Sequence, residues 1–144
     1  MLFSDERDKL RQLFFDAWKK YLNKQTLIPL EQQVVDVILL HPEYHTMLAN
    51  KDKFLDKDYT PDMGQTNPFL HMSLHLGIIE QVSTNRPKGI QSLYQHALTR
   101  FQDPHIVEHK MIEVLAQAMW EMQRSQSMMD ETVYLDKLKQ VLLK

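Results

Sequence analysis

Apolar side chains recur at helical spacing along most of this 144-residue chain, which contains only three glycines. Leu, Gln, Glu, Lys and Met, which all favour helix, are abundant, and no segment alternates apolar and polar residues as strands do. The length suffices for one hydrophobic core of normal size but not for two. We therefore expect an all-α fold, a single-domain bundle of five to six helices over residues 1–144.

Proline and N-cap residues mark where several of these helices begin. Pro29 is a favourable first residue, and Asn67-Pro68 and Asp103-Pro104 each join a capping side chain to a proline, while Asp130 caps a last helix. A short helical piece is expected from Pro42 to about residue 48. The long helices are expected at about 4–21, 29–41, 67–83, 90–102, 104–124 and 130–142. Residues 49–66 lack hydrophobic periodicity, which predicts one long loop.

Composition excludes several classes of function. The chain has no cysteine, which rules out disulfides, thiolate nucleophiles, zinc fingers and iron–sulfur clusters. Its net charge of -2 gives no electrostatic basis for nucleic-acid binding. The longest aliphatic run covers residues 37–40, whereas a membrane span needs roughly 20 residues. With no signal peptide pattern at the start, we expect a cytoplasmic protein that does not enter the membrane.

Histidine spacing is the strongest chemical signal in the sequence. Three His-x-x-x-His pairs occur, where chance would give about 0.3 from seven histidines. Residues four apart on a helix lie one above the other, so their imidazoles can converge on one metal ion. The three pairs are His41/His45, His71/His75 and His105/His109.

A helical wheel predicts that two of these pairs face the interior. His71 and His75 fall on an arc with Leu74 and Ile78, and His105 and His109 fall on one with Ile112 and Leu115. Two carboxylates could join them: Glu108 lies on the inward arc of the later pair and Glu113 lies beside His109. Each could be a metal ligand or an acceptor that fixes the tautomer of an imidazole.

Two functions remain open from these residues. The first is a transition-metal site, with zinc and iron ahead of nickel and copper, because imidazoles without thiolates suit these ions. An ion with an open position could activate water or oxygen, and one with a closed shell would be structural, so the sequence does not decide whether the protein is an enzyme. The second is a metal-free module with structural histidines that binds a protein partner, with an apolar groove near Phe54, Tyr59 and Phe69. Neither reading fixes the oligomeric state.

Several motifs along the chain resemble an uncharacterised bacterial family that is described as a domain of unknown function. They are HPEYH at 41–45, NPFLHMSLHLGIIEQ at 67–81, the turn at 87–90, HIVEH at 105–109 and the segment 120–124. The resemblance implies a small bacterial cytosolic protein and brings no activity or cofactor. The histidine spacings are also loosely similar to those of hemerythrin-like and tri-histidine metal-binding helical bundles.

Overall fold

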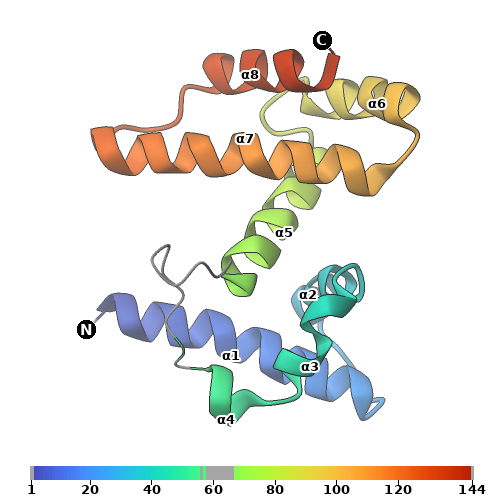
Figure 1. Ribbon diagram of the computed structural model, residues 1–144, viewed down its shortest axis with the longest axis vertical. Helices are drawn as coiled ribbons and strands as arrows, with labels where there is room; N and C mark the ends of the chain where they lie inside the picture. The colour runs from blue at the N-terminus through green and yellow to red at the C-terminus, as the bar shows by residue number, and fades with distance from the viewer. Residues whose placement is uncertain (1, 56, 58–66, 144) are drawn as a thin grey trace. The chain divides into compact units, whose positions relative to one another are not determined.

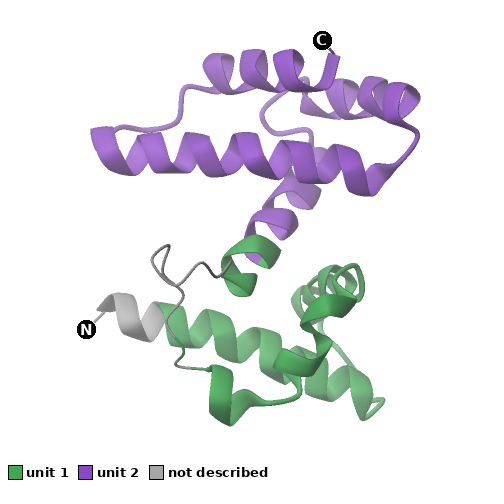
Figure 2. Ribbon diagram, viewed as in Figure 1, with its two compact units in different colours: residues 1–72 green, residues 73–144 purple. Residues whose placement is uncertain are grey.

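A computed structural model describes residues 2–55, 57 and 67–143, with side chains from residue 7 onward (Figure 1). This part of the chain contains eight α-helices, one 3-10 turn and no strand. The all-α class is thus confirmed, while the expected count of five to six helices is too low. The described residues form two compact units, residues 1–72 and 73–144, and the division falls inside one helix (Figure 2).

Unit 1 is built on α1 (Leu2–Leu22), which packs against α2 (Pro29–Leu39) and α3 (His45–Leu48). A 3-10 turn, η1 (Pro42–Tyr44), precedes α3, and α4 (Lys51–Phe54) follows it. The buried core residues of α1 and α2 in this unit are Phe14, Phe15, Ala17, Trp18, Val34, Val35, Val37 and Ile38.

The first turn of α5 (Pro68–Thr84) belongs to unit 1 and is anchored there by Phe69. The Phe69 ring lies 6.2 Å from that of Phe14 and 5.6 Å from that of Phe15, and the Arg11 guanidinium lies 4.8 Å from its centre. The Arg11 Nη1 also donates to the carbonyls of Leu55, at 3.0 Å, and Lys57, at 2.7 Å. Aromatic packing therefore holds the turn of α5 that carries His71.

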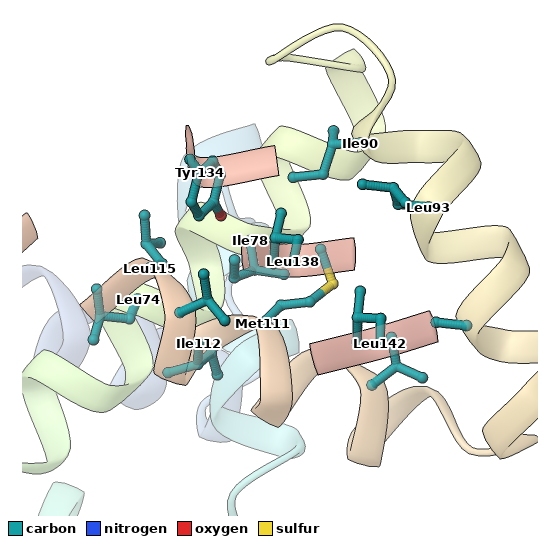
Figure 3. Packing of buried hydrophobic residues seen from close by; sticks show 13 residues of the cluster. Leu74, Ile78, Ile90, Leu93, Met111, Ile112, Leu115, Tyr134, Leu138 and Leu142 are labelled. Atoms are coloured by element: carbon teal, nitrogen blue, oxygen red, sulfur yellow. The ribbon is translucent and has the colours of Figure 1, made fainter. Parts of the chain in front are cut away.

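Unit 2 contains the rest of α5 together with α6 (Ile90–Phe101), α7 (Pro104–Ser125) and α8 (Glu131–Leu143). The last three helices contact one another pairwise and lie side by side (Figure 1). Figure 3 shows side chains from all four helices meeting in one core. Gly77 on α5 packs beside this core, since an added Cβ there would be in ordinary van der Waals contact with the Leu115 side chain, at 3.7 Å. The labelled residues of this core include Leu74, Ile78, Met111, Leu115, Tyr134 and Leu138.

The predicted helix starts at 67, 103 and 130 are confirmed by hydrogen bonds. The Asn67 Oδ1 accepts from the backbone N–H of Phe69 and Leu70, and the Asp103 side chain accepts from the N–H of His105. The Asp130 Oδ1 accepts from Thr132 and Val133 in the same way. Each cap satisfies N–H groups that the first helical turn leaves without partners.

The error in the helix count lies between residues 42 and 57. The expected piece from Pro42 to residue 48 is divided into η1 and α3, and α4 occupies part of the expected long loop. Single turns such as these are too short to show the hydrophobic periodicity by which a helix is recognised in a sequence. The remainder of that loop, residue 56 and residues 58–66, lies outside the described residues.

The described helices include none with the length and apolar character that crossing a bilayer requires.

Candidate metal centre

Pro42 determines where His41 stands in unit 1. A proline disfavours helical geometry at the residue before it, and α2 ends at Leu39, two residues ahead of His41. His41 leaves the helix with φ -128° and ψ 67°, and its side chain is buried with 1% exposure. The predicted α-helical continuation of 29–41 is thus replaced by a bend that turns the imidazole inward.

His41 lies against a second histidine and a tyrosine of the same unit. Its ring centre lies 4.8 Å from that of His71, nearly perpendicular to it, and 5.4 Å from that of Tyr44, nearly parallel to it. The Tyr44 ring is also 6.3 Å from the His71 ring. Burial raises the pKa of the Tyr44 phenol, so it remains protonated at neutral pH.

A carboxylate defines which His41 nitrogen carries the proton. The His41 Nδ1 and the Glu43 Oε1 are 2.8 Å apart. Burial raises the pKa of Glu43, but its hydrogen bond with His41 and the charges of His41 and His71 outweigh this effect, so the net pKa is lowered. The ionised carboxylate can only accept, so Nδ1 donates and a neutral His41 ring has its lone pair on Nε2.

His45 has a different environment from His41, although the two were predicted as a pair. Its Nε2 donates to the Ile38 carbonyl at 2.9 Å, and its ring lies 4.5 Å from the ring of Trp18. The 3-10 geometry of η1 comes directly before His45 and interrupts the helical register on which the pairing was based. In unit 1 the structure therefore brings together His41 and His71, and it holds His45 against α1 and α2.

In unit 2, His75 is the most deeply buried of the candidate ligands. Its side chain is fully buried, and its Nε2 donates to the Glu108 Oε1 at 2.6 Å. The other carboxylate oxygen, Oε2, accepts a hydrogen bond of 2.7 Å from the Tyr94 hydroxyl. Helices α5, α6 and α7 each contribute one member of this chain of hydrogen bonds.

The pKa shifts of Glu108 and Tyr94 determine which groups in this series of hydrogen bonds are charged. Burial raises the pKa of Glu108, but the hydrogen bonds from His75 and Tyr94 and the charges of His75 and His105 outweigh it, so the carboxyl has a lowered pKa. Burial and the neighbouring Glu108 raise the pKa of Tyr94 strongly. At neutral pH the carboxylate is thus ionised and accepts from both neighbours, which leaves the lone pair of a neutral His75 on Nδ1.

The pair His105/His109 lies close to His75 in the same unit. The His109 ring is 5.5 Å from the His75 ring and 4.0 Å from the His105 ring, while His105 and His75 are 6.5 Å apart. The His109 Nδ1 donates to the His105 carbonyl at 2.9 Å, which leaves the lone pair of a neutral ring on Nε2. His109 is partly buried, whereas His105 is exposed, so the predicted inward orientation is wrong for His105.

The two predicted carboxylates and the residues of the expected apolar groove have different environments. Glu108 touches His75, as an acceptor for its ring proton. Glu113 is exposed on α7. Phe69, which was expected to line an exposed apolar groove with Phe54 and Tyr59, is instead 2% exposed in the core of unit 1. Tyr59 lies outside the described residues.

Sequence reasoning missed the contributions of Tyr94 and Glu43. Tyr94 lies at helical spacing among apolar residues, and nothing in the spacing from Tyr94 to Glu108 signals a hydrogen bond between two helices. The direction of the Glu43 side chain does not follow from the sequence, because Pro42 breaks the helical register beside it. Both partners become visible only when the helices are packed.

Comparison with known proteins identifies one relationship. A family model described as "Domain of unknown function (DUF1841)" matches residues 6–140. No curated protein and no solved structure matches the chain.

Proposed function

We propose that this chain, which belongs to the DUF1841 family, binds a transition-metal ion through its histidines. His41, His71, His75 and His109 are a set that could hold one. The observation that carries this proposal is the full burial of His75 beside His109, with Glu108 accepting its Nε2 proton. A carboxylate bonded to the far nitrogen is the usual companion of a metal-binding imidazole.

The contacts and spacings that relate these four histidines each lie within one unit or on one helix. His41 lies against His71 in unit 1, and His75 lies against His109 in unit 2. His71 and His75 are four residues apart on α5, which is continuous from Pro68 to Thr84. Since residues at this spacing share a helix face, α5 supplies two of the four ligands.

Hydrogen bonds assign the nitrogen that three of these ligands would use. His41 would bind through Nε2 because Glu43 accepts from its Nδ1, and His109 would bind through Nε2 because a carbonyl accepts from its Nδ1. His75 would bind through Nδ1. An all-imidazole set suits zinc, iron, nickel or copper and disfavours magnesium and calcium, which prefer oxygen. Zinc and iron are the first ions to test.

The direct test is calorimetric titration of metal-stripped protein with Zn²⁺ and, without oxygen, with Fe²⁺. Wild type should bind near one equivalent, and His75→Ala should abolish binding. His96→Ala is the matched control, because His96 is an exposed histidine of α6 in the same unit. Equal binding by wild type and His75→Ala would overturn the proposed site.

The same titration tests the metal-free alternative, in which the histidines are structural. If wild type binds neither ion while the His75→Ala protein is less stable, the histidine serves only the fold. The cytoplasmic location and the single domain remain expectations from the sequence.

A further inference from the structure

We propose that Glu108 is a positioning residue for the metal ligand His75, and that Tyr94 in turn holds Glu108; this inference rests on the proposed metal site. The sequence left open whether Glu108 would bind an ion itself or orient an imidazole. The hydrogen bonds in unit 2 favour the second role.

Both oxygens of the Glu108 carboxylate are already engaged. Oε1 accepts from His75 at 2.6 Å and Oε2 accepts from Tyr94 at 2.7 Å. To bind an ion directly, one of these oxygens would have to share its electron density between the ion and a short, charge-assisted hydrogen bond. As an acceptor it keeps both bonds and directs the Nδ1 lone pair of His75.

Burial makes this arrangement rigid. His75 is fully buried and Glu108 has 13% of its side chain exposed, so water competes little for either hydrogen bond. Tyr94 comes from α6 and holds Oε2, the carboxylate oxygen that His75 does not contact. The imidazole therefore has one orientation before an ion arrives, which lowers the cost of binding.

The negative charge of Glu108 also changes how strongly the His75 imidazole donates electrons to a metal. A carboxylate that accepts the Nε2 proton makes the other nitrogen of the ring a better electron donor to a metal. Removal of the charge at Glu108 should weaken binding even where the fold is kept. This effect separates a positioning role from a structural one.

The experiment measures Zn²⁺ affinity by competition with a chromophoric chelator, using metal-stripped full-length protein. Glu108→Gln keeps the length of the side chain and removes its charge, and we expect Kd to rise about 10- to 100-fold. Tyr94→Phe removes only the hydroxyl that holds Glu108, and we expect a smaller rise in the same direction. It keeps the inference testable if Glu108→Gln does not fold.

Two control variants match these changes. Glu80→Gln removes an exposed carboxylate from α5, the helix that carries His75. Tyr134→Phe removes the hydroxyl of a second tyrosine of unit 2, which is buried and donates to Gln81 at 2.8 Å. We expect both controls to keep the wild-type Kd, although Tyr134→Phe should lower the melting temperature of the metal-stripped protein.

X-ray absorption of the Zn²⁺-loaded proteins gives a second readout. Glu108→Gln should keep the same number of imidazole ligands as wild type. Loss of an oxygen ligand in this variant would show that Glu108 binds the ion directly and would overturn the inference. A wild-type Kd in folded Glu108→Gln would overturn it as well, and a wild-type Kd in Tyr94→Phe would overturn the assignment of Tyr94.

The outcomes also distinguish this inference from the proposed function. If wild type binds no Zn²⁺, the metal site itself is wrong and the positioning role fails with it. If wild type binds and His75→Ala does not, but Glu108→Gln binds as wild type does, the metal site stands and only the role of Glu108 is wrong.

Discussion

His75 donates its Nε2 proton to Glu108 across 2.6 Å, from a side chain that no solvent reaches. A buried imidazole needs a partner on each nitrogen that carries a proton, because an unsatisfied buried polar group costs about 1–3 kcal/mol. The pair therefore contributes to the fold of unit 2 as well as to the proposed metal site. Variants of His75 should separate these two contributions.

His75→Ala should destabilise the metal-stripped protein by about 3 kcal/mol, since it leaves the Glu108 carboxylate without one of its donors in a largely buried position. His75→Gln should recover part of this loss, because its amide can donate to Glu108 from a position similar to that of Nε2. Neither variant should bind metal. Urea unfolding and Zn²⁺ titration of both proteins provide the measurement, and equal stability of the two variants would contradict the predicted donor role.

His45 should behave in the opposite way to His75. Its hydrogen bond to the Ile38 carbonyl and its contact with Trp18 give it a structural role in unit 1. We expect His45→Ala to lower the free energy of unfolding by about 1–3 kcal/mol and to keep the wild-type metal stoichiometry. Loss of the metal from a folded His45→Ala protein would place this residue among the ligands.

Acid should weaken unit 1 through Glu31. Its Oε2 accepts from the Lys20 Nζ at 2.7 Å and its Oε1 from the backbone N–H of Ile28 at 2.9 Å. The Lys20 hydrogen bond, then that of Ile28, lowers the pKa of Glu31 below its ordinary value of 4.5. The folded state thus holds the carboxylate ionised to lower pH than the unfolded chain does, so the stabilisation is complete above pH 4.5 and is lost as pH falls through the folded pKa.

Glu31→Gln tests this pH dependence. The variant should melt below wild type at pH 7, and the two melting temperatures should converge on acidification below pH 4.5. Asp136→Asn, which changes an exposed carboxylate of α8, is the control for a general charge effect. A difference between wild type and Glu31→Gln that stays constant with pH would argue against the ion pair.

The single domain expected from the sequence can be tested because each unit contains one tryptophan, Trp18 in unit 1 and Trp120 in unit 2. Helix α5 contributes buried Phe69 to unit 1 and buried Ile78 to unit 2 without a break. We therefore predict one cooperative transition. Trp120→Phe leaves Trp18 as the fluorescent reporter and Trp18→Phe leaves Trp120. For each variant, the fluorescence midpoint should equal the circular dichroism midpoint of the same protein; a mismatch would indicate separate domains.

The long helices were predictable because their signals are local. Capping side chains at 67, 103 and 130 and hydrophobic spacing over three or more turns depend only on neighbouring residues. The turns at η1, α3 and α4 were not predictable in the same way, because such short elements are determined by packing.

The candidate site was likewise predictable where its signals are local, and not where it depends on packing. His-x-x-x-His spacing identified His71 and His75 correctly as neighbours on one helix, since that relationship is local. The same spacing paired His41 with His45, whereas the structure places His41 against His71 and His45 against Trp18. Pro42 and η1 account for this difference, because they end the helical register between the two residues. Contacts between helices, such as Tyr94 to Glu108, leave no trace in the spacing of residues.

Metal content tests the central claim most directly. Untagged protein, purified without chelating resin, should carry near one transition-metal ion per chain by elemental analysis, and protein with His75→Ala purified alongside should carry none. Zinc or iron is the expected element. Wild-type protein that contains no transition metal, and whose melting temperature does not rise when zinc, iron, nickel or copper is added, would contradict the account.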